Sequence, residues 1–439
     1  TRSLCVFELT GYAKVCVSFN MLDLRLGKHE ADDPTKQEEE DDSMKGQKVK
    51  KKPYALQKPA NTALRQQRLK AWHPILTHST VLPLLFGIGV FFAVLGAVMY
   101  WSATQVNELT IEYSSCRDEA PRSGVAPADV PAKYYNYRFR HNHDMQQRSP
   151  VQWEVEEIPP GPGHENNPPR FQCTLYFIIP EQMDPGVFLY YELTNFYQNH
   201  RRYMKSMDYL QLLDKPRTVD QLQKDQCKPL GRDPNSGLAV YPCGLIANSV
   251  FNDTFASPVL LDAENTPIRN YSMSEKNIIW SEEYRHYKTP TYNVSEIVPP
   301  PFWQGAEGPF GYPSGRYEEG KVFDPSKNEH FQVWMRTAAF PYFRKLYRRN
   351  DTDPMTPGRY SLVVEDNYPV NMFKGTKSVV LSTSSWIGGR SLVIGASHIS
   401  VAALCFLLGI VLSGMQLVRP RRVGDASYLS WNNPRKQRT

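Results

Sequence analysis

Sequence motifs of common catalytic and metal sites are missing from this chain of 439 residues. It has no Cys-x-x-Cys and no His-x3-His spacing, which disfavours a zinc site. It has no Gly-x-Ser-x-Gly, which disfavours a serine hydrolase. Residues 315–322 (GRYEEGKV) resemble a phosphate loop, but Val322 stands where a metal-binding Ser or Thr is needed, and Glu318 and Glu319 would repel phosphate. Nucleotide binding and these hydrolase chemistries are therefore disfavoured.

The remaining ionisable groups do not assemble an active site either. His141 and His143 could share one face of a strand, but no third metal ligand accompanies them. Glu154, Glu156 and Glu157 could serve a glycosidase, yet any glycosylated ectodomain carries spare carboxylates. We expect a protein that is not an enzyme and that holds no cofactor and no metal.

Formal charges are absent from two long apolar stretches, residues 81–101 and 392–418. As a helix rising about 1.5 Å per residue, each is long enough to cross about 30 Å of hydrocarbon. A charge at mid-bilayer costs several kcal/mol, so such runs indicate transmembrane helices rather than core helices of a soluble protein. The first run begins about eighty residues into the chain and lacks a small-residue cleavage site, which argues against a signal peptide.

Basic residues flank both stretches on one side. Arg65 and Arg68 precede the first stretch, and Arg419 and Arg421 follow the second, whereas Arg390 is an exception on the opposite side. Because Lys and Arg favour the cytosolic side, we predict that both termini are cytosolic. The expected parts are a mostly disordered cytosolic tail (1–80), a transmembrane helix (81–101), a luminal or extracellular domain (102–391), a second transmembrane helix (392–418) and a cytosolic tail (419–439).

The N-terminal tail has the composition of a disordered segment. An acidic block at residues 38–42 precedes a lysine-rich block at 45–52, and opposed charge blocks with few apolar residues cannot bury a core. The first twenty residues differ in composition, and we expect Met21 to be the natural start. The net charge of +6 needs no nucleic-acid partner. Basic residues beside the bilayer attract anionic membrane lipids, at about 1 kcal/mol each.

Cysteines in the large loop indicate disulfides. The loop contains Cys116, Cys173, Cys227 and Cys243, and an even set in an oxidising compartment predicts two bonds with three possible pairings. We favour the sequential pairing, Cys116–Cys173 and Cys227–Cys243. The second bond would close a loop of about sixteen residues, which stabilises the fold by about 3 kcal/mol through loop entropy.

N-glycosylation sequons occur only in the same loop, and their position supports the predicted topology. We expect Asn252 and Asn293 to be the most readily modified. The four sequons begin at Asn252, Asn270, Asn293 and Asn350.

Frequent prolines in the loop argue against long helices, and short runs of β-branched and aromatic residues favour strands. Together they predict an antiparallel β-rich domain with short helices, closed by disulfides. Strands are expected at residues 171–179, 186–191, 360–365 and 378–382. Helices are expected at residues 193–207, 218–224 and 332–349.

Small residues in the second stretch, such as Gly395, Ala402 and Gly409, allow close approach of another helix. His398 is its only imidazole. Either the two stretches pack on each other, or this helix docks against a larger membrane protein. Two helices are too few to line a transport route alone, because polar faces in lipid are costly.

Five segments in the same order resemble the cell division control protein 50 (ligand-effect modulator) family. Most run past ten residues, and with the helices the resemblance covers about residues 61–418, leaving out the tail before Pro59. The segments are 61–77 (NTALRQQRLKAWHPILT), 190–203 (YYELTNFYQNHRRY), 242–253 (PCGLIANSVFND), 328–349 (NEHFQVWMRTAAFPYFRKLYRR) and 381–389 (LSTSSWIGG).

The resemblance implies a function. Members of that family are non-catalytic β-subunits of type IV P-type ATPases, flippases that move aminophospholipids to the cytosolic leaflet. They support the folding, endoplasmic reticulum exit and activity of the catalytic subunit, with which they form a heterodimer. Membership would place the chain in the endoplasmic reticulum, Golgi, endosomes and plasma membrane. The alternatives are a free-standing surface receptor, which would be exported alone, and a luminal glycosidase.

The resemblance also suggests contact residues. Six residues before the first helix would touch the pump at the cytosolic face or anchor the chain in the interface. Four residues of the ectodomain would either bond internally or touch the luminal loops of the pump, and His398 would face it in the membrane. The cytosolic set is Arg65, Gln66, Gln67, Arg68, Trp72 and Pro74, and the ectodomain set is Asn195, Tyr197, His200 and Arg201.

Overall fold

A computed structural model describes residues 61–69, 77–141, 149–159, 169–215, 217–224, 227–305, 308–420 and 426. The described residues 61–69 belong to one unit and those from Thr77 onward to another, and the two units are considered individually. The predicted disordered tail up to Pro59, the Met21 start, Trp72 and Pro74 lie outside the described residues, as does nearly all of the C-terminal tail.

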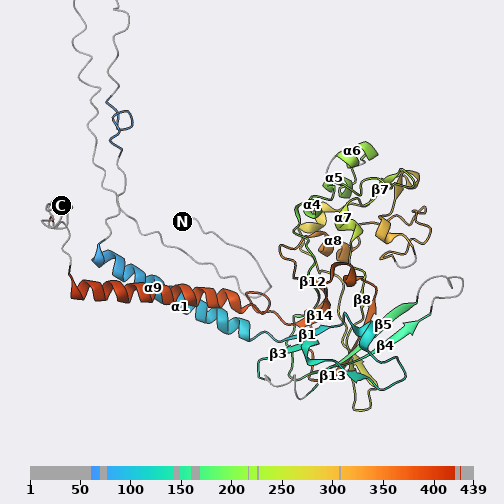
Figure 1. Ribbon diagram of the computed structural model, residues 1–439, viewed down its shortest axis with the longest axis horizontal. Coiled ribbons are helices and arrows are strands. Elements are labelled where there is room, and N and C mark those ends of the chain that lie inside the picture. The colour runs from blue at the N-terminus through green and yellow to red at the C-terminus, as the bar shows by residue number, and fades with distance from the viewer. Residues whose placement is uncertain are drawn as a thin grey trace, which may run out of the picture. The chain divides into compact units, whose positions relative to one another are not determined.

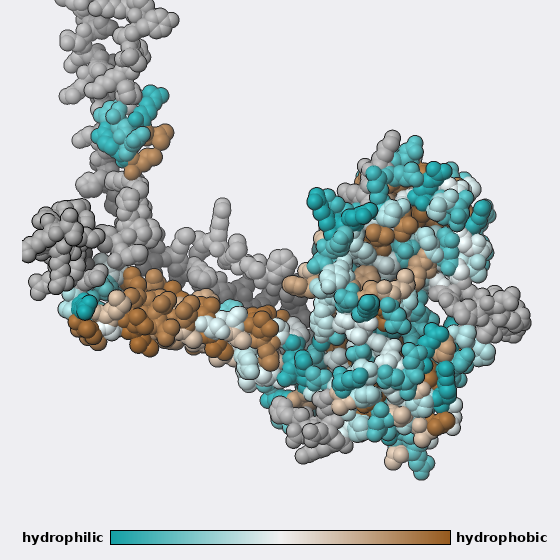
Figure 2. Space-filling view, in the orientation of Figure 1, coloured by the Kyte–Doolittle hydropathy of each residue, from teal (hydrophilic) through white to brown (hydrophobic). Residues whose placement is uncertain are grey.

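Two apolar helices have the length of membrane spans. Helix α1 runs His78–Thr104 and α9 runs Leu392–Val418, and both are mostly exposed to the surroundings of the protein. They contain the two predicted spans; α1 extends three residues further at each end, and α9 begins and ends where predicted. Figure 2 shows a nearly continuous hydrophobic surface along both helices. An exposed apolar surface of this size fits contact with lipid.

Glycines set the contact between α1 and α9, which lie side by side in Figure 1. Gly89 faces the ring of Phe406, Gly96 faces the backbone of Ile399, and Gly395 faces the backbone of Tyr100. A Cβ at Gly395 would lie 2.7 Å from the backbone nitrogen of Tyr100. Small residues on both helices therefore let the backbones approach closely.

A five-stranded antiparallel sheet, sheet A, connects directly to both membrane helices. Its order is β12-β6-β14-β1-β3. Strand β1 follows α1, and β14 precedes α9; in register, Glu108 pairs with Ser382. The strands are β1 (Glu108–Glu112), β3 (Tyr135–Arg138), β6 (Val187–Leu193), β12 (Phe343–Asn350) and β14 (Lys377–Ser382).

The second sheet, sheet B, has the order β10-β9-β13-β5-β4-β2, with β8 paired to β13. Burial alternates strictly along β5, as expected for a strand with one face in the core. A separate parallel pair joins β7 (Ala239–Val240) to β11 (Ile297–Val298). The strands of sheet B are β2 (Ala128–Asp129), β4 (Gln152–Ile158), β5 (Arg170–Ile179), β8 (Thr254–Phe255), β9 (Val259–Leu261), β10 (Pro267–Asn270) and β13 (Gly358–Asp366).

Short helices fill the connections, and the fold class is as predicted: a membrane hairpin with a β-rich ectodomain. The α-helical turns are α2 (Cys116–Glu119), α4 (Arg201–Met204), α5 (Tyr209–Leu212), α6 (Val219–Lys224), α7 (Leu245–Asn248) and α8 (Glu329–Met335). The 3-10 turns are η2 (Ala132–Tyr134), η3 (Glu283–His286), η4 (Val294–Glu296), η5 (Pro301–Trp303) and η6 (Val370–Phe373).

All four strand predictions are confirmed, and the predicted helix at 218–224 corresponds to α6. Two helix predictions are wrong. Residues 332–349 contain only the end of α8, after which Phe343–Asn350 form β12, with Phe343, Lys345 and Tyr347 buried on alternate positions. Residues 193–207 contain only the four-residue α4, because Asn195 adopts a positive φ of 56° that ends regular structure after β6.

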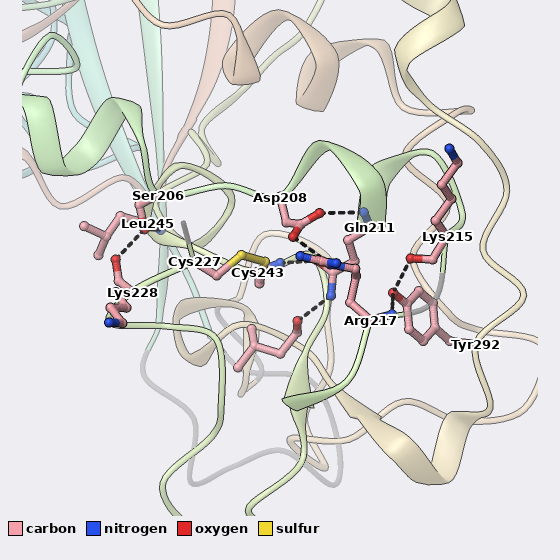
Figure 3. Close-up of a disulfide and its surroundings, with 11 residues drawn as sticks. Ser206, Asp208, Gln211, Lys215, Arg217, Cys227, Lys228, Cys243, Leu245 and Tyr292 are labelled. Atoms are coloured by element: carbon pink, nitrogen blue, oxygen red, sulfur yellow. Dashed lines mark hydrogen bonds and ion pairs between the residues drawn. A yellow bond between two sulfur atoms is a disulfide. The ribbon is translucent and has the colours of Figure 1, made fainter. Parts of the chain in front are cut away.

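Two disulfides close the ectodomain in the sequential pairing. Cys116–Cys173 ties α2 to β5, and Cys227–Cys243 closes a loop with a sequence separation of 16. Figure 3 shows the second bond beside Asp208, Gln211 and Arg217. The Gln211 side chain donates to Val240 O and accepts from the backbone amide of Cys243, both at 2.9 Å. This buried amide therefore fixes the loop that carries the disulfide.

Candidate partner-binding surface

The segment after β6 presents alternate side chains to the core and to solvent. Phe196 packs edge-on against Phe373, with ring centroids 5.0 Å apart, and the Oε1 of the fully buried Gln198 accepts from Ala338 N at 2.8 Å. Tyr197, between them, is 56 % exposed. Buried neighbours on both sides hold Tyr197 outward on a rigid support, which is the arrangement expected of a contact residue.

Asn195 has a structural role in the turn. Its Nδ2 donates to Phe373 O at 2.5 Å, and its positive φ reverses the chain. The neighbouring Thr194 hydroxyl lies 2.8 Å from that of Thr376. The bonds of Asn195 agree with the internal alternative for this residue.

His200 and Arg201 are exposed, and their side chains make no hydrogen bond or ion pair within the described part of the chain. Tyr197 and His200 line one shallow hollow of about 440 Å³, together with Arg202 and Tyr203. Tyr203 forms the inner wall, with its hydroxyl 2.8 Å from that of Ser249. Burial raises the pKa of Tyr203, so the phenol stays neutral. The structure thus brings Tyr197 and His200 together with Arg202 as one open, cationic and aromatic area, and the exposed Arg201 does not line it.

Exposed apolar side chains that were not predicted from the sequence border this area. The main chain of Phe196 donates to Pro341 O at 3.1 Å, which places the 338–342 turn beside the 195–201 segment. Phe340 and Met372 are 72 % and 83 % exposed. We call Tyr197, Phe340, Tyr342 and Met372 the aromatic rim. A proline flanked by aromatics (FPY) was the available signal, since proline ends regular structure and leaves its neighbours exposed.

Arg344 supports the aromatic rim from below. Its guanidinium bridges two buried carboxylates, with Nη1 2.6 Å from Glu108 and Nε 2.6 Å from Glu192. Tyr342 donates to the same Glu192 carboxylate at 2.7 Å. Burial opposes the charge of Arg344, but hydrogen bonds and charge from Glu108 and Glu192 raise its pKa. The network joins the aromatic rim to β1, the strand that follows α1.

The residues predicted before the first helix form a turn in the other unit. Gln66 N donates to Thr62 O at 2.9 Å, Arg68 N donates to Ala63 O at 2.7 Å, and Gln67 has a positive φ of 54°. The side chains of Arg68 and Asn61 are hydrogen-bonded. Arg65 and Gln67 are exposed. The turn leaves this basic segment accessible.

His398 is used within the membrane hairpin. Its Nδ1 lies 2.7 Å from Ile394 O, and its ring centroid lies 5.6 Å from that of Phe92 on α1. Gly96 faces its Cβ. These contacts favour packing of the two spans on each other for this face of α9.

Side chains of the motifs that we judged not to be catalytic or metal sites form ion pairs in the structure. Lys321 of the phosphate-loop-like segment pairs with Glu318 at 2.7 Å on the surface. His141 pairs with Glu181 at 2.8 Å. Within the described residues, no group of three or more metal-ligating side chains is gathered.

Comparison with known proteins gives a consistent result. Residues 99–422 match the LEM3 (ligand-effect modulator 3) family / CDC50 family. The chain is 36% identical over 381 residues to the Phospholipid-transporting ATPase accessory subunit CDC50 of Chaetomium thermophilum, covering 86% of this chain and 92% of the relative. It is 38% identical over 376 residues to the accessory subunit CRF1 of Saccharomyces cerevisiae (86% and 89%). It is 34% identical over 367 residues to Cell cycle control protein 50A of Mus musculus (81% and 88%).

Proposed function

The chain belongs to the LEM3/CDC50 family, and we propose on that basis that it is the non-catalytic accessory subunit of a phospholipid-transporting P-type ATPase. The observation that carries this proposal is the match with accessory subunits over nearly their whole length, 92% of one and 89% of another. The same match supports a protein that is not itself the enzyme.

The architecture supports an assembly of this kind. The two membrane helices pack on each other through glycines, and two helices are too few to line a polar route for a lipid headgroup. Transport must therefore be performed by a partner, which we propose is a type IV ATPase in a heterodimer with this chain. The expected contribution of the chain is to the folding, endoplasmic reticulum exit and activity of that partner.

Two surfaces are proposed for the partner. The aromatic rim with His200 and Arg201 would contact it on the ectodomain side, since exposed aromatic and arginine side chains on a rigid support are typical of interface anchors. Arg65, Gln66, Gln67 and Arg68, with Trp72 and Pro74, would contact it on the other side of the membrane. His398 is a weaker candidate because its ring faces α1.

We propose that both termini are cytosolic and that residues 102–391 are luminal or extracellular. The basic residues before α1 and after α9 support this orientation. The expected locations are the endoplasmic reticulum, the Golgi, endosomes and the plasma membrane. Two disulfides in the ectodomain support an oxidising compartment for that part of the chain.

Burial separates the four sequons. Asn270 and Asn293 are exposed and Asn252 is half-buried. Asn350 is 7 % exposed, and its Nδ2, where a glycan would attach, donates to Ser272 O at 2.9 Å. We propose glycans on the exposed Asn270 and Asn293, and Asn270 replaces the half-buried Asn252 that we favoured from the sequence. Gel mobility before and after glycosidase digestion tests this. Asn270→Gln and Asn293→Gln should each remove the mobility shift of one glycan, whereas Asn350→Gln should remove none.

The decisive test of function is a pull-down of the tagged full chain from its native membranes, with mass spectrometry of co-purifying proteins. A stoichiometric P-type ATPase supports the proposal. Recovery should be lost when α9 is replaced by an unrelated transmembrane helix and retained when only the C-terminal tail is replaced. Export of the chain alone, with no ATPase bound, would instead identify a free-standing receptor.

A further inference from the structure

A second cavity lies where the ectodomain meets the membrane helices. It has a volume of about 330 Å³, within the range of small-ligand sites, and it is lined by Trp101 and Gln105 at the end of α1, by Arg140 and Asp184, and by Thr383 and Ser384 after β14. No residue discussed above as a partner contact lines it. We call it the membrane-rim pocket.

The level of this pocket relative to the membrane follows from its position at the end of α1. Trp101 is in the last turn of α1 and is 62 % exposed, as expected for an aromatic side chain at a membrane interface. Gln105 follows four residues later, about 6 Å further along a helical rise. The headgroup layer is roughly 5–7 Å thick on each side of the hydrocarbon. The pocket therefore lies at the depth of the lipid headgroups in the leaflet nearest the ectodomain.

Hydrogen bonds fix the backbone that surrounds the pocket. The backbone amide of Arg140 is fixed by Asn107 Oδ1 at 3.0 Å and by Glu181 Oε1 at 2.7 Å. Asn107 is itself held by Thr383, whose hydroxyl accepts its amide at 3.0 Å. The chain at Arg140 is thus tied to both strands that lead into the membrane helices.

Charges of both signs are free at this place. The side chains of Arg140 and Asp184 are exposed and make no ion pair or hydrogen bond within the described residues. Arg390 donates to Val106 O, another residue of the pocket wall, at 2.8 Å and has no carboxylate within ion-pair distance in the same part of the chain. This is the arginine that departs from the positive-inside pattern. A phosphate in the headgroup layer would account for its charge.

We propose that the membrane-rim pocket binds the zwitterionic headgroup of a glycerophospholipid from the leaflet nearest the ectodomain. The phosphate lies toward Arg140 and Arg390, the ammonium group lies toward Asp184, and the acyl chains follow Trp101 along α1. A cation and an anion that line the same cavity match the two charges of this headgroup. The inference does not depend on the proposed partner, because the chain alone contains the whole site.

The test uses the full chain in detergent and dioctanoyl phosphatidylethanolamine as the probe, with bound lipid measured by native mass spectrometry and by thermal shift. Arg140→Gln and Asp184→Asn should each weaken binding roughly tenfold, since each removes a hydrogen bond to a charged group. Arg269→Gln and Asp220→Asn are matched controls, because both residues are exposed and lie outside the pocket. Both controls should bind like the unmodified chain.

Three results would overturn the inference. Binding that is equal in all variants would mean that the probe only coats the apolar helices. Equal binding of free phosphoethanolamine or inorganic phosphate would mean a site for soluble phosphates rather than for a lipid. Loss with Arg140→Gln but not with Asp184→Asn, together with tighter binding of dioctanoyl phosphatidic acid, would mean an anionic and not a zwitterionic ligand.

Discussion

Lys377 and Asp253 form an ion pair that is wholly inside the ectodomain, with Nζ and Oδ2 2.8 Å apart and the two side chains 1% and 0% exposed. Asp366 lies on the other side of the ammonium group at 2.5 Å, and Tyr113 donates to Asp253 at 2.8 Å. Lys377 begins β14 of sheet A, whereas Asp366 ends β13 of sheet B. One ammonium group therefore joins the two sheets through charges that are 124 and 11 residues away in sequence (377 − 253 and 377 − 366).

Lys377→Met should destabilise the ectodomain by about 3–5 kcal/mol, because it leaves two buried carboxylates without their cation. Burial already raises the pKa of Asp366, and the charge of Lys377 opposes that rise. Without the lysine, Asp366 should take up a proton more readily, so the loss should shrink as pH falls. Thermal unfolding of the full chain in detergent at several pH values measures this effect.

Lys276→Met is the control for that series, since Lys276 is exposed and its side chain makes no ion pair within the described residues. It should change stability by less than about 0.5 kcal/mol. Equal stability of the two methionine variants would show that the buried pair contributes nothing.

Alkaline pH should unfold the ectodomain through its tyrosines. Burial raises the pKa of Tyr347 to about 12, and it raises the pKa values of Tyr191 and Tyr368 well above 10. Because these tyrosines ionise near pH 10 in the unfolded chain but not in the folded chain, their contribution to stability is constant below pH 10 and is lost as pH rises above it. Absorbance at 295 nm, recorded with circular dichroism, should show most tyrosinate appearing together with loss of structure. Full ionisation near pH 10 with structure retained would contradict this prediction.

The membrane helices and strands could be predicted because their signals are local. An uncharged apolar run is sufficient for α9, and β5 shows its alternation in the residues themselves. Strand β12 could not be predicted, since its basic residues also suit a helix. Its buried Lys345 is tolerated only because Nζ donates to Val333 O at 2.9 Å and Trp334 O at 2.8 Å at the end of α8. Tertiary contacts rather than local propensity therefore decide that this segment is a strand and not a helix.

The candidate surface was predicted only in part. Tyr197, His200 and Arg201 lie within five residues of one another, so one sequence motif could identify all three. Phe340 joins them through backbone pairing of Phe196 with Pro341, 145 residues apart (341 − 196), and nothing local indicates that approach. The Glu108–Arg344 pair, 236 residues apart, is equally invisible in the sequence.

The aromatic rim should be needed for recovery of the ATPase but not for folding. Tyr197→Ser combined with Phe340→Ser removes two exposed aromatic groups and should lower the co-purifying ATPase roughly tenfold, as expected when interface anchors are truncated. The unfolding temperature of the isolated chain should stay nearly constant, because neither side chain is in the core.

Ile268→Ser is the matched control for the rim, because Ile268 is 61 % exposed on the edge strand β10 of sheet B. It removes one exposed apolar side chain at a site that the proposal does not use. If Ile268→Ser lowers recovery as much as the rim variant does, the effect comes from general surface properties and the rim has no specific role.

Two glycines of α9 allow a test of the close packing between α1 and α9, because only one of them lies at the contact. A Cβ at Gly395 would lie 2.7 Å from the backbone of Tyr100, whereas a Cβ at Gly414 would meet nothing within 4 Å. Gly395→Val should therefore force α1 and α9 apart and destabilise the hairpin by about 1–3 kcal/mol, as overpacking does in other interiors. Gly414→Val adds the same side chain to the same helix and should leave thermal stability in detergent unchanged. If Gly414→Val nevertheless reduces ATPase recovery in the pull-down, the open face at Gly414 is where the partner helix packs, because the hairpin itself does not use that space.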